Sequence, residues 1–413
     1  MAIQFFNTVG IDEFIIHNGD TTTKFGFVAN NNFAINTAGV ERVRVTSGGS
    51  VGIATNNPGA KLDVEGNAVI GSTLNTATGQ WAVAIGNDNT ASALDSLATG
   101  ENTTASGRQS FSGGFNTTAS GAGSFAHGGS TLASGTNSFA AGAETEATQP
   151  GAAAFNNQTN ATGINSFATG GNTTASGEAS FSGGVSSTAH GLASVVFGLS
   201  CNSYQNGSIS GGTVSTASNY SIAWGDNADA TGTASQAFGY ITTAAASYSM
   251  AAGFNNTTGA NASAVFGQQN NFNSSCIRTF GSGFFNTMQS ADSAVFGSYN
   301  GFTWNLSTTA SNQFMLGKYL NVPRAGSNGA ASDSCTIVGK HNKYTNMGGE
   351  AFVVGTGTGV GVEANSFTVR YDGNVLMEQI VNKNYTSDSA AAAGGVPIGG
   401  IYHNAGDLKI RLT

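Results

Sequence analysis

The clearest pattern along the chain is an alternation of small and large residues in short segments. In Ser110-Phe111-Ser112-Gly113-Gly114, residues 110, 112 and 114 are small, and Phe111 stands between two of them. Because successive side chains of a strand point to opposite faces, the small residues share one face and Phe111 lies on the other. Residues 117–121 again put small residues on one face, with Thr118 and Ser120 on the other. The pattern predicts two short β-strands in each repeat.

The period of this pattern is fourteen residues, and one glycine in each repeat marks it. The marker recurs every 14 residues, except for one step of 13, at Gly86, Gly100, Gly114, Gly128, Gly142, Gly170, Gly184, Gly198, Gly212, Gly225, Gly239, Gly253, Gly267 and Gly281, with Asn156 in one slot. It then spreads out to Gly297, Gly317, Gly339 and Gly355. Fourteen residues accommodate two strands of about five residues and two tight turns, with glycine supplying the turn conformations.

The predicted fold is therefore all-β: a β-roll or solenoid of about nineteen coils with a thin interior of alanine, serine and glycine. The large face of the first strand has no place inside such a coil. A stripe of Phe, Val and Ile along the coils would exceed the apolar patch that soluble monomers expose. Burial of each Phe stabilises by about 2–3 kcal/mol. We expect the stripe to meet other copies of the chain through rotational symmetry.

Composition and charge exclude several classes of protein. The 60 glycines exclude a helical protein, and the recurring aromatic residues argue against disorder. A net charge of −8 gives no basic footprint for nucleic acid. No apolar run reaches about 18 residues, so we expect no membrane insertion. The first twenty residues lack the pattern of a signal peptide, which predicts a protein made for the cytoplasm.

The coil pattern SxAxGxxxxAxGxx, seen at residues 138–142 and 166–170, resembles the head repeat of YadA-type trimeric autotransporter adhesins. The resemblance covers residues 82–267 closely and residues 268–355 loosely. It implies left-handed β-rolls packed in threes about an axis, and therefore a homotrimeric shaft. The chain departs from that family because it shows no export signal, no heptad stalk and no closing membrane-barrel strands.

Two further segments resemble proteins of tailed bacteriophages. Residues 36–71, which include ERVRVTSGG and VGIAT, look like a segment common in phage fibre proteins. The closing stretch AAAAGGVPIGGIYHNAGDLKIRLT, residues 390–413, is similar to carboxy termini of phage virion proteins. Together they imply a homotrimeric structural fibre of the virion, on its tail or head, assembled in the host cytoplasm. Such a fibre would join other virion proteins through one terminus and contribute to attachment to a glycan or protein on the host surface.

Charge and periodicity divide the chain into five predicted segments. Most charged residues lie outside the regular repeats. We expect a β-rich amino-terminal module for virion attachment, a transition of the phage-fibre type, a regular β-roll, an irregular β-roll with loop insertions, and a small β-rich cap. These span residues 1–35, 36–80, 81–281, 282–355 and 356–413.

The sequence offers little that suggests catalysis. No GxSxG, HExxH or Walker pattern is present, and none of the five histidines has metal-ligand spacing to another ligand. We therefore expect no enzyme activity, no cofactor and no metal. The three cysteines stand in unrelated contexts and are predicted to be buried, inert thiols. Alternatives to the fibre are a tailspike that degrades polysaccharide at a site between chains, a bacterial trimeric adhesin, and an ice-binding solenoid.

The irregular coils carry the candidate contact residues. Their wider spacing predicts inserted loops, and the aromatic residues in this part of the chain are Tyr299, Phe302, Trp304, Tyr319 and Tyr344. Aromatic side chains on protruding loops suit contact with sugars or with protein. The alternative is that they fill the interior of a widening trimer.

Overall fold

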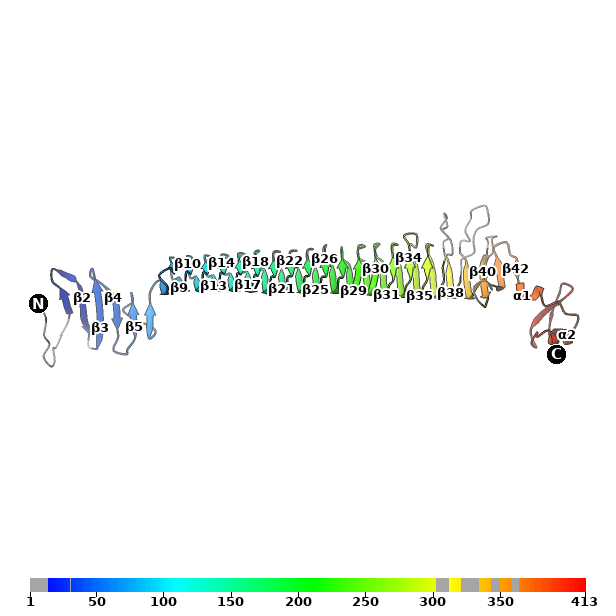
Figure 1. Ribbon diagram of the computed structural model, residues 1–413, viewed down its shortest axis with the longest axis horizontal. Helices are drawn as coiled ribbons and strands as arrows, with labels where there is room; N and C mark the ends of the chain where they lie inside the picture. The colour runs from blue at the N-terminus through cyan, green and yellow to red at the C-terminus, as the bar shows by residue number, and fades with distance from the viewer. Residues whose placement is uncertain (1–13, 30, 302–311, 321–333, 343–349, 359–363) are drawn as a thin grey trace. The chain divides into compact units, whose positions relative to one another are not determined.

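The computed structural model describes residues 14–29, 31–301, 312–320, 334–342, 350–358 and 364–413. It confirms an all-β chain dominated by a parallel β-solenoid of about 20 turns with a repeat of about 14 residues. The short strands of successive coils lie side by side in rows (Figure 1). The chain divides into two units, residues 1–172 and 173–413, which are described separately.

The first unit begins with a six-stranded sheet. Its strands are β1 (Phe14–His17), β2 (Asp20–Ala29), β3 (Asn32–Thr37), β4 (Val40–Val45), β5 (Val51–Ile53) and β6 (Leu62–Val64). Neighbours pair antiparallel, except β5 and β6, which are parallel. Ala34 is fully buried, but Ile16, Phe25 and Phe27 remain exposed. This sheet leaves much of its apolar surface uncovered.

Each coil of the first unit has a longer first strand and a two-residue second strand. The first strands are β7 (Ala68–Gly71), β9 (Val83–Asn87), β11 (Leu97–Glu101), β13 (Phe111–Phe115), β15 (Phe125–Gly129), β17 (Phe139–Ala143), β19 (Ala153–Asn157) and β21 (Phe167–Gly171). The second strands are β8 (Thr76–Ala77), β10 (Thr90–Ala91), β12 (Thr104–Ala105), β14 (Thr118–Ala119), β16 (Leu132–Ala133), β18 (Glu146–Ala147) and β20 (Asn160–Ala161).

The second unit continues the same pattern. Its first strands are β23 (Phe181–Val185), β25 (Val195–Leu199), β27 (Ile209–Thr213), β31 (Met250–Phe254), β33 (Ala264–Gln268), β35 (Phe280–Phe284), β37 (Ala294–Ser298), β38 (Phe314–Lys318), β39 (Thr336–Lys340) and β40 (Glu350–Thr356). Its second strands are β22 (Thr174–Ala175), β24 (Thr188–Ala189), β26 (Asn202–Ser203), β28 (Thr216–Ala217), β32 (Thr257–Thr258), β34 (Asn271–Phe272) and β36 (Thr287–Met288). The nine-residue strands β29 (Ile222–Ala230) and β30 (Gln236–Ala244) run through both segments of their coils.

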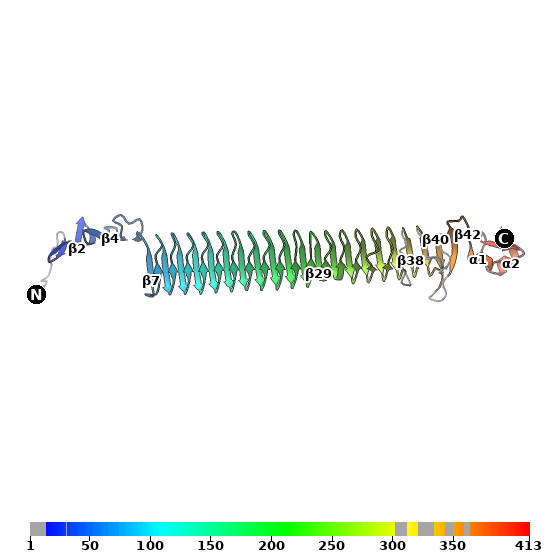
Figure 2. The same ribbon diagram turned by 90° about the horizontal axis from the view of Figure 1, so that it is seen from above.

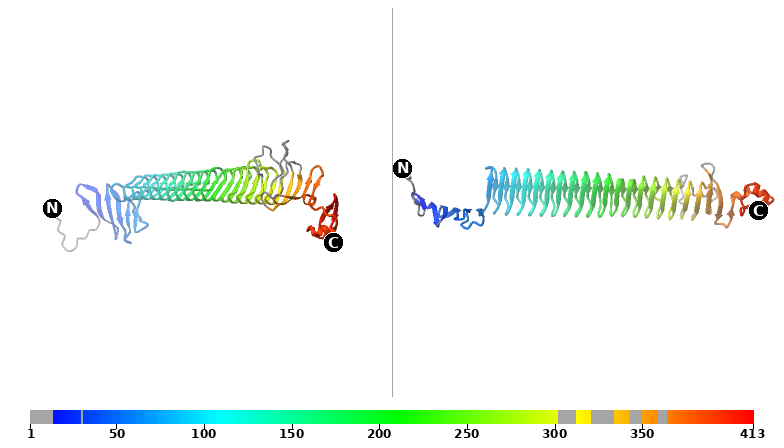
Figure 3. Two further views of the ribbon diagram at one scale, coloured as in Figure 1. Left: turned by 45° about the vertical axis from the view of Figure 1, so that its right-hand side comes forward. Right: turned by 90° about the horizontal axis from the view of Figure 1, so that it is seen from below.

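Strands pair in parallel with their equivalents one coil later. Phe111 pairs with Phe125, and Phe125 with Phe139, so each residue lies beside the residue fourteen positions on. Seen from above and from below, the coils repeat as evenly spaced rungs (Figures 2 and 3). This register turns every position of the repeat into a ladder along the coils.

The predicted interior of small residues is confirmed in the early coils, but the later coils bury larger side chains, such as those of Phe272, Met288 and Ile337. In the coil that begins at Ser110, the residues Ser110, Ser112, Thr117, Ala119 and Gly121 are buried. Some buried hydroxyl groups have acceptors in the backbone of their own turn, as Ser96 Oγ donates to the carbonyl of Ala93 at 2.8 Å. Others, such as those of Ser110, Ser124 and Ser138, have no hydrogen-bond partner among the described residues.

The marker glycine lies in the first strand, where the alternation of residues 110–114 places it, but the tight turns are not formed by it. Gly128 lies in strand β15 with φ +126°, and a Cβ there would lie 1.9 Å from the carbonyl oxygen of Gly142 in the next coil. The tight turns instead use residues such as Gln109 and Asn116 in the left-handed region, with φ +59° and +54°. The glycine is required by the close approach of neighbouring backbones and by its own φ.

One assignment of the marker is also wrong. Gly283, not Gly281, pairs with Gly267 and Gly297, so the first two-residue insertion comes before this glycine. Gly281 is an interior position of β35. The ring of Phe272 fills the space there, because a Cβ on Gly281 would lie 2.0 Å from the ring. A large residue on one strand is compensated by a glycine on the next.

The chain closes with a small module. Strands β40, β41 (Asn365–Arg370) and β42 (Val375–Leu376) pair antiparallel, followed by α1 (Glu378–Val381), α2 (Asp388–Ala393) and the hairpin β43 (Ile401–Asn404) and β44 (Asp407–Ile410). Asp388 accepts hydrogen bonds from Tyr402 Oη at 2.7 Å and from the amide of Leu412 at 2.8 Å. These bonds lower the pKa of the Asp388 carboxyl. Among the described residues, no helix has the length and apolar content to cross a membrane.

Adjacent glycines allow a direct test of the backbone constraint. Gly128→Ala should destabilise the fold by about 2–3 kcal/mol, because the Cβ collides with the next coil in a conformation that alanine rarely adopts. The measurement is the thermal or denaturant unfolding of the full chain.

Gly129→Ala is the matched control, since a Cβ there has nothing within 4 Å. It should unfold like the parent chain within about 0.5 kcal/mol. Equal stability of the two variants would contradict the role assigned to the marker glycine.

Candidate functional site

The structure brings no chemically reactive cluster together among its described residues. No group of three His, Cys, Asp or Glu side chains there could hold a metal ion. All three cysteines are buried as predicted and none forms a disulfide. Burial raises the pKa of Cys276 to about 12, so its thiolate is scarcely populated at neutral pH. The features that stand out are two surfaces of stacked side chains.

The first surface, here called the apolar seam, is the outer face of the first strands. It consists of the first and third residues of the first strand of each coil, from β13 to β21 in the first unit and from β23 to β38 in the second. The rings of Phe111 and Phe125 are 4.7 Å apart, and those of Phe125 and Phe139 are 4.5 Å apart. Phe181 and Phe197 stack at 4.6 Å in the second unit.

The rings are distributed between the two seam positions in a restricted way. No first strand from β13 to β38 carries Phe or Trp at both positions, but β27 and β31 carry neither, and β15 has His127 two residues after Phe125. Where the ring is first, as at Phe111, the third residue can be small, and a Cβ on Gly113 would lie 2.8 Å from that ring. Each coil of the seam therefore carries at most one Phe or Trp ring.

The rings are partly covered by their own chain. Phe167 is 36% exposed and Trp224 is 49% exposed, so neighbouring parts of the chain already cover about half of each residue or more. The alternation of residues predicts an apolar stripe without cover from its own chain, whereas the seam is partly covered. The remaining gain on full burial is correspondingly smaller, about 1 kcal/mol per ring, but it is repeated in most coils.

The second surface, here called the aromatic column, consists of Phe285, Tyr299, Tyr319 and His341. Their ring centroids are separated by 5.3, 4.8 and 4.4 Å in that order, with interplanar angles of 12–18°. Each residue sits two positions after a marker glycine, at the turn that leaves the first strand. Phe285, Tyr299 and Tyr319 have φ of +55°, +57° and +55°.

The structure therefore corrects the predicted location of two candidate residues. Tyr299 and Tyr319 were expected on inserted loops, but they lie on tight turns and stack on each other. Phe302, Trp304 and Tyr344 lie outside the described residues. Phe285 and His341 were not among the predicted site residues. Counting two positions on from each marker glycine would have found them.

A ladder of buried asparagines supports the column. Asn286 and Asn300 directly follow the column residues Phe285 and Tyr299, and both are buried. The Nδ2 of Asn300 donates to the carbonyl of Gly317 at 2.9 Å, and its Oδ1 accepts from the amide of Leu320 at 2.9 Å. Asn286 likewise accepts from the amide of Asn300 at 3.1 Å. These bonds fix the backbone of the turns that carry the column.

Positive charge accompanies the column. Lys318 and Lys340 are exposed and lie in register on β38 and β39. The Nζ of Lys318 lies 5.0 Å from the ring centroid of Tyr319 and 6.0 Å from that of Tyr299. Among the described residues, neither lysine has a carboxylate within ion-pair distance.

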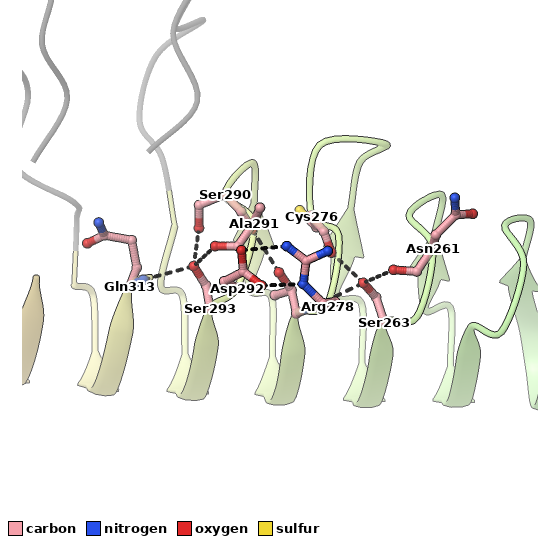
Figure 4. Close-up of polar contacts among 10 residues, drawn as sticks. Asn261, Ser263, Cys276, Arg278, Ser290, Ala291, Asp292, Ser293 and Gln313 are labelled. Carbon is pink, nitrogen blue, oxygen red and sulfur yellow. Dashed lines mark hydrogen bonds and ion pairs between the residues drawn. The ribbon is translucent and has the colours of Figure 1, made fainter. Parts of the chain in front are cut away.

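The connection between β34 and β35, on the other side of the coil from the column turns, carries Arg278, and the charge of this arginine is neutralised. Arg278 donates to both carboxylate oxygens of Asp292 across neighbouring coils, beside the serine contacts of Ser263 and Ser293 (Figure 4). This bond lowers the pKa of Asp292. Among the described coil residues of the second unit, the cations that have no carboxylate partner are therefore Lys318 and Lys340.

No protein-family model and no curated protein sequence matches this chain. The roles of the seam and the column consequently depend on their geometry and on the resemblances described above.

The asparagine ladder can be tested by removing one rung. Asn286→Ala deletes the acceptor of the Asn300 amide and the donor to the carbonyl of Gly297. Leaving buried backbone groups without partners should lower stability by about 2–4 kcal/mol. The measurements are thermal unfolding and the near-ultraviolet circular dichroism of the stacked tyrosines.

Asn271→Ala is the control, because Asn271 occupies an exposed position of β34. It should change neither signal appreciably. A stable Asn286→Ala chain with an unchanged tyrosine spectrum would show that the ladder does not hold the column.

Proposed function

We propose that this chain is the subunit of a homotrimeric structural fibre of a tailed-bacteriophage virion, without enzymatic activity, that contributes to attachment to the host surface. The observation that carries the proposal is the apolar seam. Its rings run along the coils of each unit and are partly exposed, and five of them, Phe167, Phe197, Trp224, Phe280 and Phe314, are at least 36% exposed. A surface of this extent is typical of one that a partner covers.

Another copy of the chain is the best-matched partner. A covering surface must present apolar groups at the same coil-by-coil spacing, and the seam itself does so. Because no first strand carries Phe or Trp at both seam positions, two or three seams can approach one another along the coils. Rotational symmetry then satisfies all copies at once. The exposed Ile16, Phe25 and Phe27 of the amino-terminal sheet favour the same solution.

The virion assignment is supported by the two resemblances to phage proteins, at residues 36–71 and 390–413. The rigid coils between them suit a shaft, because parallel pairing links each coil to its neighbours. The attachment role is supported by the aromatic column, in which Phe285 and Tyr299 are exposed and His341 is buried. Beside the column are cations that lack a carboxylate partner among the described residues.

Assembly is the direct test. The purified chain should sediment with about three times its mass of 41.4 kDa. Replacing two seam rings with Phe125→Asp and Phe139→Asp should reduce assembly by at least tenfold, since each carboxylate would be buried against apolar partners. Analytical ultracentrifugation measures both outcomes.

Thr118→Glu is the matched control, because the native chain already carries Glu146 at this position of the repeat. It should assemble like the parent. A folded, soluble single chain would overturn the proposed architecture.

The place of the fibre is tested by electron microscopy. Antibody raised against the chain should label thin projections on phage particles. Label confined to the surface of bacteria would contradict a virion role and favour a bacterial adhesin.

A further inference from the structure

The aromatic column breaks two local rules at one edge of the coil. Bulky aromatic residues are rare in the left-handed region, yet Phe285, Tyr299 and Tyr319 all adopt it. Most earlier coils fill the same slot with residues that tolerate it better, such as Asn116 and Asn172, although Val214 and Ile241 also occupy it. Strained backbone of this kind gathers at functional sites.

The second broken rule concerns charge. Lys318 and Lys340 are paired in register on neighbouring strands, where like charges repel. Residues 62–317 contain no lysine, two arginines and eleven carboxylates, so positive charge is scarce before this point. Two unfavourable choices at one edge indicate selection for something other than folding.

The geometry decides what kind of ligand the column could take. The rings stack with interplanar angles below 20°, so each covers the faces of its neighbours. A sugar therefore cannot stack on the inner ring faces. What remains accessible is the ring edges with the hydroxyl groups of Tyr299 and Tyr319, which form no hydrogen bond with a described residue. Beside them are two ammonium groups.

We propose that the aromatic column with Lys318 and Lys340 binds an acidic polysaccharide. The lysines would pair with successive anionic groups of the chain, and the tyrosine hydroxyls would hydrogen-bond its hydroxyl groups. The repeated rungs suit a linear polymer that runs along the coil axis. This inference deepens the proposed attachment role and depends on it for its biological meaning.

Binding of defined polymers to the full chain tests the ligand chemistry. Polygalacturonate, which has carboxylates and hydroxyls, should bind, and dextran sulfate should bind as a second source of the same chemistry. Neutral dextran should bind at least tenfold more weakly, because it lacks the anionic groups. Polyphosphate, which lacks hydroxyls, should also bind at least several-fold more weakly. Equal binding of either comparison polymer would overturn the proposal.

Variants test the location. Lys318→Gln should weaken polygalacturonate binding about tenfold, and the double variant with Lys340→Gln should abolish it. Tyr319→Phe keeps the ring and removes the hydroxyl, so it should weaken binding about threefold or more. Arg108→Gln is the control, since it removes one exposed cation of the coils elsewhere and should bind within twofold of the parent. Equal loss in Arg108→Gln would show non-specific charge attraction instead of a site.

Sedimentation of each variant separates this inference from the proposed function. A trimer that does not bind the polymer would overturn the inference alone. A monomer that binds with the predicted dependence on Lys318 would overturn the trimeric fibre and leave the site in place.

Discussion

In the coils of this protein each side chain lies beside its own equivalent in the next coil. Parallel pairing at a fixed register of about fourteen residues imposes this, and the rest of the structure depends on it. Residues that pair well with themselves become stabilising ladders: alanine packs in the thin interior, phenylalanine stacks in the seam, and asparagine links coil to coil through Asn286 and Asn300. Residues that pair badly with themselves, such as lysine, accumulate cost with each rung. The sequence of one coil must therefore be read together with its neighbours.

This constraint explains how much of the fold was predictable. The period and the presence of two strands in each coil follow from one-dimensional spacing and alternation and are confirmed, although the second strand has two residues in most coils instead of about five. The interior of small residues is confirmed in the early coils only, because larger apolar residues are buried in the later ones. The role of the marker glycine was not predictable in the same way, since only the three-dimensional approach of Gly128 to the carbonyl of Gly142 shows why this strand position requires it. Likewise, Gly281 and Gly283 each lie 14 residues from a neighbouring marker, and the strand pairing decides between them.

The candidate site was predictable in part. Irregular spacing directed attention to Tyr299 and Tyr319, but it suggested loops, because insertions and aromatic residues occur together in this part of the sequence. The insertions follow the column residues instead of containing them. The position two residues after the marker glycine is polar in most early coils and becomes Phe, Tyr, Tyr and His later. That change is visible in the sequence. The stacking of these side chains depends on the left-handed conformation of the turn, however, and the residue types at this position do not predict that conformation.

The seam and the column use the same register for different purposes. The seam stacks apolar rings, which gain by being covered, so in the proposed trimer identical surfaces would close on one another. The column concentrates like charges, and closure with another copy would increase their repulsion, because each added copy brings lysines of its own. A partner of opposite charge would relieve that repulsion. In a trimer three such columns would lie on one shaft, so a weak contact at each column would add up to firm attachment along a single polymer or among several. The proposed trimer and the proposed attachment role would thus be linked by the same ladder geometry.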